Sequence, residues 1–113
     1  MQSLARCVKW KAKGGKSGSA FSKTLDGRFV IKQLSRSEMV SFLKFAPAYF
    51  EYMSKAIFKK NPTALAKIFG VYQLQHKSTE TGKSFKQDVL VMEDLFYNRN
   101  IKRVRTFPIF FFF

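Results

Sequence analysis

The chain is poor in acidic residues and in cysteine, and it has no long hydrophobic run. Its 113 residues include 7 Asp and Glu against 21 Lys and Arg, which gives a net charge of +14. Such an excess favours anionic partners: nucleic acid, an acidic membrane surface or phosphorylated molecules. The single cysteine, Cys7, excludes an internal disulfide and fits a reducing compartment. Because no apolar stretch is long enough for a signal peptide or a bilayer span, we expect neither.

Histidine is equally scarce, which weakens most catalytic and metal-binding interpretations. His76 is the single histidine, and no second ligand stands at metal-binding spacing from it. One histidine also gives little support to a nucleophilic triad. We predict that Cys7 is a small buried hydrophobe or an unreactive thiol. Asp26, Asp88 and Asp94 are predicted to be turn or surface residues rather than catalysts.

What the chain does contain is a series of short segments with β periodicity. These predict strands at 4–12, 20–25, 28–34, 68–76 and 85–92. Asp26-Gly27 is a strong signal for a two-residue hairpin between the second and third of them. The third strand should alternate its faces, with Phe29, Ile31 and Gln33 opposite Val30, Lys32 and Leu34.

One long helix is predicted between the third and fourth strands. Ser35 and Glu38 match the capping box that marks a helix start, and apolar residues keep helical spacing up to Ile57. Pro47 lies inside this pattern, so we expect a kink or two helices. A short helical turn should follow at 63–67. The result is an α+β fold, a mostly antiparallel sheet with one long, kinked helix.

The candidate site begins with a glycine-rich stretch, residues 14–19, which satisfies neither the Walker pattern nor the protein-kinase G-x-G-x-x-G pattern. Its backbone N–H groups could form an anion-binding concavity; the alternative is a flexible surface turn. Lys32 could bond nucleotide phosphates if a carboxylate holds it; the alternative is a lysine that reaches solvent at a sheet edge. Glu38 is its nearest candidate partner. We do not expect Glu38 to serve both this pair and the helix cap, and the sequence favours the cap.

Six blocks of sequence, at 7–10, 14–21, 26–34, 41–50, 62–72 and 89–97, support a more specific interpretation. In this order they resemble the kinase domain of the phosphatidylinositol 3-phosphate 5-kinases, the PIKfyve-type lipid kinases. The FAPAYF block at 45–50 and the PTALAK block at 62–67 distinguish this subfamily from other phosphatidylinositol phosphate kinases. The resemblance covers residues 3–104.

The resemblance implies that residues 1–104 are part of a phosphatidylinositol phosphate kinase domain, its small ATP-binding lobe. It implies that Lys32 contacts ATP and that backbone groups of Asp94 and Leu95 face adenine in a hinge. It also implies that the glycine-rich residues cover the phosphates, namely Gly15, Lys16, Ser17, Gly18 and Ser19. The family usually has asparagine at the position of Asp94, a small departure because backbone groups carry the contact.

The resemblance further implies a phosphotransferase that uses ATP and Mg²⁺ to phosphorylate phosphatidylinositol 3-phosphate. Such an enzyme would be cytoplasmic and peripheral on an endosomal or vacuolar membrane. The blocks that supply catalytic and metal-binding aspartates in the family are missing, so we expect no catalytic or metal residues here and no activity from this chain alone. Residues 105–113 include five phenylalanines. We interpret them as an aberrant tail, translated from an intron or a shifted reading frame.

Two other functions stay open. One is a catalytically dead module that binds a partner or regulates; the other is a small basic nucleic-acid-binding protein. Lys9, Lys11 and Lys13 share one face of a predicted strand. Nucleic-acid binding would need exposed aromatic residues among them, whereas most aromatic residues here have core spacing. We therefore expect no nucleic-acid partner.

Overall fold

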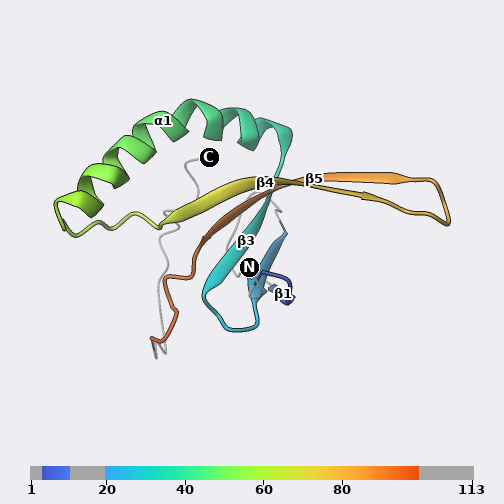
Figure 1. The fold of residues 1–113 in the computed structure, drawn as a ribbon, viewed down its shortest axis with the longest axis horizontal. Helices are drawn as coiled ribbons and strands as arrows, with labels where there is room; N and C mark the ends of the chain where they lie inside the picture. The colour runs from blue at the N-terminus through green and yellow to red at the C-terminus, as the bar shows by residue number, and fades with distance from the viewer. Residues whose placement is uncertain (1–3, 11–19, 100–113) are drawn as a thin grey trace.

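A computed structural model describes residues 4–10 and 20–99, which form one antiparallel sheet and one helix (Figure 1). The predicted α+β class is confirmed. The sheet has five strands in the order β1-β2-β3-β5-β4. The elements along the chain are β1 (Cys7–Trp10), β2 (Phe21–Thr24), β3 (Phe29–Leu34), α1 (Arg36–Phe58), β4 (Ile68–Lys77) and β5 (Ser84–Glu93).

The turn between β2 and β3 is longer than the sequence predicted. It spans residues 25–28 rather than two residues, because Thr24 organises it. The buried Thr24 hydroxyl accepts the Phe29 amide at 3.1 Å and donates to the Asp26 carboxylate at 2.6 Å. Asp26 is therefore a turn residue, as predicted. Gly27 has a φ of 71°, a left-handed conformation that glycine adopts without strain.

Helix α1 runs through Pro47 without a break, so the alternative of two helices is wrong. Figure 1 shows the helix arching over the sheet. Its apolar face packs against the sheet and compensates for the backbone hydrogen bond that proline cannot make. The core cluster contains Phe42 of α1 together with Val30, Leu34, Leu90 and Met92 of β3 and β5.

The short helical turn predicted at 63–67 is also absent from this described stretch. Pro62 offers no backbone donor. The Leu65 amide instead donates to the Thr63 hydroxyl at 3.1 Å, and the Ala66 carbonyl accepts the Tyr49 hydroxyl at 2.6 Å. These contacts keep the segment non-helical and attach it to α1.

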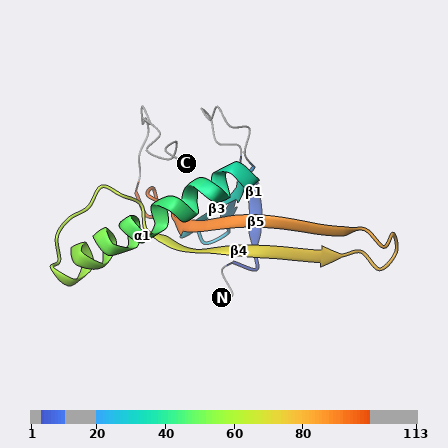
Figure 2. The ribbon, with the colours of Figure 1, turned by 90° about the horizontal axis from the view of Figure 1, so that it is seen from above.

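The distal half of the β4–β5 hairpin projects beyond the rest of the fold in both views (Figures 1 and 2). Its apolar side chains are accordingly exposed, among them Leu74 and Phe85. No helix among the described residues combines the length and apolar character needed to cross a bilayer.

Cys7 lies on β1, which forms the edge of the sheet opposite β4, and it is exposed. The prediction of a small buried hydrophobe is therefore wrong. Its Sγ donates to the Leu4 carbonyl at 3.1 Å. Partial burial, and to a smaller extent the Asp26 charge, raise the pKa of the thiol. A raised pKa lowers the thiolate fraction, which fits the alternative prediction of an unreactive thiol.

Candidate functional site

Lys32 and Glu38 form a buried ion pair between the sheet and the helix. The two faces of β3 alternate as predicted, and the face with Val30, Lys32 and Leu34 is the buried one. Lys32 Nζ lies 2.7 Å from Glu38 Oε1, and the two side chains are only 3% and 10% exposed. The alternative of a lysine that reaches solvent at a sheet edge is therefore wrong. Removing one partner of such a pair leaves an uncompensated buried charge.

Glu38 also caps the helix, so the expectation that it serves one role is wrong. Its second oxygen, Oε2, accepts the Ser35 amide at 2.8 Å, while the Glu38 amide donates to Ser35 Oγ at 3.2 Å. The two carboxylate oxygens divide the tasks between them. The N-terminus of α1 is thereby fixed relative to Lys32.

The electrostatics of Glu38 favour its charged form. Burial raises the pKa of this carboxyl, but the hydrogen bonds from Lys32 and Ser35 outweigh that effect and leave the pKa below its ordinary value. Hydrogen bonds to a carboxylate stabilise the ionised state. The Glu38 carboxyl is therefore ionised at neutral pH.

Asp94 and Leu95, which the resemblance assigns to a hinge, begin the segment 94–99 after β5, which we call the connecting segment. The Asp94 amide donates to the Arg28 carbonyl at 2.8 Å, and the Asp94 carbonyl accepts the Tyr97 amide at 3.0 Å. The Asp94 carboxylate accepts the Phe96 amide at 2.9 Å. Both backbone groups of Asp94 are thus engaged within the protein. Within residues 20–99 no such partner occurs for the Leu95 amide.

The Asp94 side chain is buried and pairs with Lys23 of β2. The sequence placed Asp94 in a turn or at the surface; the turn is confirmed, and the surface position is wrong. Lys23 is not among the site residues predicted from the sequence. Period two does put Lys23 on the same face as Phe21, but its nearness to Asp94 depends on pairing between distant segments. Lys23 lies opposite Val30 of β3, and Glu93, the residue before Asp94, lies opposite Phe29 of the same strand.

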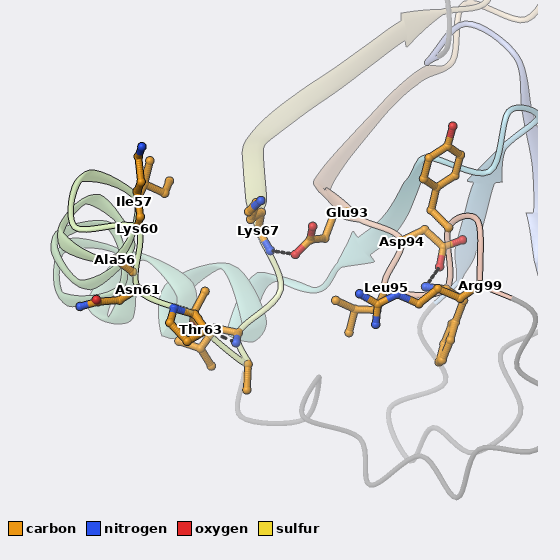
Figure 3. A pocket seen from close by; sticks show the side chains of 15 residues that line it. Ala56, Ile57, Lys60, Asn61, Thr63, Lys67, Glu93, Asp94, Leu95 and Arg99 are labelled. Carbon is orange, nitrogen blue, oxygen red and sulfur yellow. Dashed lines mark hydrogen bonds between the residues drawn. The ribbon is translucent and has the colours of Figure 1, made fainter.

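A cavity of about 900 Å³ lies beside the connecting segment (Figure 3). One wall comes from the end of α1 and the residues after it, and the other from Glu93 and the connecting segment. Glu93 Oε1 accepts the Lys67 amide at 2.8 Å where these walls meet. Asp94 and Leu95 line the cavity, but Lys32 and Glu38 do not. The structure therefore does not gather all predicted site residues into one cavity.

The predicted phosphate-covering residues, Gly15, Lys16, Ser17, Gly18 and Ser19, lie outside the described residues. The strands on either side of them are paired antiparallel, with Trp10 opposite Phe21. In the described part of the chain, no group of three acidic, cysteine or histidine side chains could hold a metal ion.

Comparisons with known proteins agree on one family. The family model described as Phosphatidylinositol-4-phosphate 5-Kinase matches residues 3–108. The chain is 58% identical to 1-phosphatidylinositol 3-phosphate 5-kinase FAB1 of Saccharomyces cerevisiae. Identity is 55% to 1-phosphatidylinositol-3-phosphate 5-kinase FAB1B of Arabidopsis thaliana and 50% to 1-phosphatidylinositol 3-phosphate 5-kinase of Homo sapiens. Each match covers 92% of this chain but only 5% or 6% of the relative.

Proposed function

Because the chain belongs to the phosphatidylinositol-4-phosphate 5-kinase family, we propose that it is the ATP-binding part of a lipid kinase acting on phosphatidylinositol 3-phosphate. The names of similar proteins state that activity. The chain spans about one twentieth of their length, 5% or 6%. The proposal therefore assigns nucleotide binding to this chain and lipid phosphorylation to a longer protein.

The observation that carries the proposal is the buried Lys32–Glu38 pair at 2.7 Å. A lysine held by a carboxylate presents a fixed cation that can bond nucleotide phosphate oxygens. We assign the phosphates of ATP to Lys32 and to the glycine-rich residues, from Gly15 to Ser19.

We assign the contact with the adenine base of ATP to the backbone of Leu95 rather than to that of Asp94, because both Asp94 backbone groups already have protein partners. Asp94 is bonded to Arg28, which directly precedes β3, the strand that carries Lys32. The four-residue separation between Arg28 and Lys32 corresponds to about 13 Å of extended chain. This separation suits an extended nucleotide with its base at one end and its phosphates at the other.

The described residues do not by themselves fit a magnesium site, so we include Mg²⁺ only as the ion that accompanies ATP. Phosphoryl transfer also needs carboxylates that hold metal and orient the acceptor, and we assign these to parts of the longer relatives. The net charge of +14 supports a peripheral position on an anionic membrane. An endosomal or vacuolar surface is proposed from the resemblance.

Calorimetric titration of the full chain with a non-hydrolysable Mg-ATP analogue tests the proposal. Lys32→Met should weaken binding by about tenfold or more, because a charge-assisted contact is lost. The matched control is Lys55→Met, which removes a comparably short pair with Glu51, at 2.6 Å, from the exposed surface of α1. Circular dichroism verifies that both variants are folded. The proposal fails if the unmodified chain does not bind, or if Lys32→Met binds as well as Lys55→Met.

A further inference from the structure

The ion pair between Lys23 and Asp94 connects two parts of the proposed nucleotide site that lie far apart in the sequence. Lys23 belongs to β2, the strand that leaves the glycine-rich stretch. Asp94 begins the connecting segment directly after β5. The Asp94 carboxyl is only 2% exposed, and within the described part of the chain no further hydrogen-bond donor serves its Oδ2 atom.

We propose that Lys23 and Asp94 are positioning residues whose ion pair, here called the clasp, sets the Leu95 amide for contact with the base of the nucleotide. The inference rests on the proposed function. Asp94 uses one carboxylate oxygen for Lys23 and the other for the Phe96 amide. The bond to the Phe96 amide shapes the turn that contains Leu95. Because the same carboxylate binds Lys23, the position of Lys23 sets the orientation of the carboxylate and therefore the conformation of that turn.

Neighbouring contacts explain why the clasp holds a whole segment. The Asp94 amide donates to the Arg28 carbonyl at 2.8 Å, in the β2–β3 turn. The Arg28 guanidinium lies over the Tyr97 ring, 5.7 Å from its centre, which is cation–π range. The connecting segment is therefore attached to the β2–β3 hairpin at its beginning and again three residues later.

The two partners differ in exposure, and this difference makes the proposal testable. The Lys23 side chain is 33% exposed, against 2% for Asp94. Lys23→Met leaves the buried Asp94 carboxylate without its cation, and an uncompensated buried charge is strongly destabilising. Asp94→Asn leaves a lysine that water can solvate, and the amide oxygen can still accept the Phe96 N–H. The double variant contains neither charge.

The test compares three properties of the full chain in Lys23→Met, Asp94→Asn, the double variant and the Lys55→Met control. They are the affinity for a Mg-ATP analogue, the affinity for magnesium tripolyphosphate, which has no base, and the hydrogen-exchange rate of the Phe96 amide. Lys23→Met should weaken analogue binding and accelerate Phe96 exchange, each by about tenfold. Its tripolyphosphate affinity should change by less than about twofold, because the clasp acts on the base contact. Asp94→Asn should also weaken analogue binding, but less than Lys23→Met, because it leaves no buried charge unpaired and its amide oxygen still accepts the Phe96 N–H. Because both single changes break the same ion pair, their losses should not add in the double variant.

Three results would overturn the clasp: no effect of Lys23→Met, equal losses for the two ligands, or losses that add in the double variant. Failure of the proposed function looks different, because the unmodified chain then binds no nucleotide. In that case faster Phe96 exchange in Lys23→Met, with no further increase in the double variant, still supports the clasp as the contact that fixes the segment. Unchanged exchange overturns it.

Discussion

At the scale of single residues, Glu38 is held in place through both of its carboxylate oxygens. One oxygen bonds Lys32 at 2.7 Å and the other bonds the Ser35 amide at 2.8 Å. Either bond alone would permit the side chain to turn. Together they fix the carboxylate plane, and with it the place of the lysine ammonium.

The stability of the chain should therefore depend on pH through Glu38. Its pKa is lowered on folding, so its contribution is complete above the unfolded value of about 4.3 and is lost as pH falls through the lower folded value. Glu38→Gln should cost about 3 kcal/mol at neutral pH, because Lys32 loses its counter-charge. Urea denaturation at about pH 7 and about pH 3.5 measures both effects. The difference between the two proteins should shrink at the lower pH; a constant difference contradicts the assignment.

At the scale of elements, Tyr49 attaches the helix to the first residues of β4. Its buried hydroxyl donates to the Ala66 carbonyl at 2.6 Å and accepts the Ile68 amide at 2.9 Å. One side chain thus supplies partners to a backbone group just before β4 and to the first backbone amide of β4. This contact fixes the segment that forms one wall of the cavity.

Tyr49→Phe should lower the free energy of unfolding by about 2 kcal/mol, because two partly buried backbone groups lose their partner. Tyr52→Phe is the matched control. Its hydroxyl makes an exposed bond to the Thr63 side chain at 3.2 Å, and its loss should cost less than about 0.5 kcal/mol. Chemical denaturation of both variants gives the comparison. Equal losses would show that Tyr49 does not hold this connection.

The elements that sequence analysis predicted well are those defined by local patterns. The capping box at Ser35 and the alternation of β3 need only neighbouring residues, and the structure confirms both. The helical turn at 63–67 fails because Tyr49 and Thr63 supply competing hydrogen bonds. The insertion of β5 between β3 and β4 could not be predicted, because it depends on pairing between distant segments. The Lys23–Asp94 pair was missed for the same reason.

At the scale of the whole molecule, positive charge is the dominant feature. The net charge is +14 on 113 residues, and 21 Lys and Arg stand against only seven Asp and Glu, so basic side chains outnumber acidic ones threefold. Mutual repulsion among these cations opposes the compact state, and dissolved salt screens it.

Raising sodium chloride from about 20 mM to about 200 mM should therefore raise the melting temperature by about 3 °C. Thermal denaturation of the full chain, followed by circular dichroism, measures the shift. Potassium chloride should have the same effect, because screening depends on ionic strength. A falling melting temperature would show that attractive ion pairs outweigh the repulsion.

The clasp also has a consequence for the order in which the fold assembles. Lys23 and Asp94 stand near the two ends of the described continuous stretch, residues 20–99. Their ion pair closes a loop that contains β3, the helix and the whole β4–β5 hairpin. Contacts between residues so far apart in sequence form late in folding, because closing the loop lowers the chain entropy before the contact stabilises the fold. The clasp would then mainly slow unfolding, so the proposed base contact becomes available only once the sheet is complete.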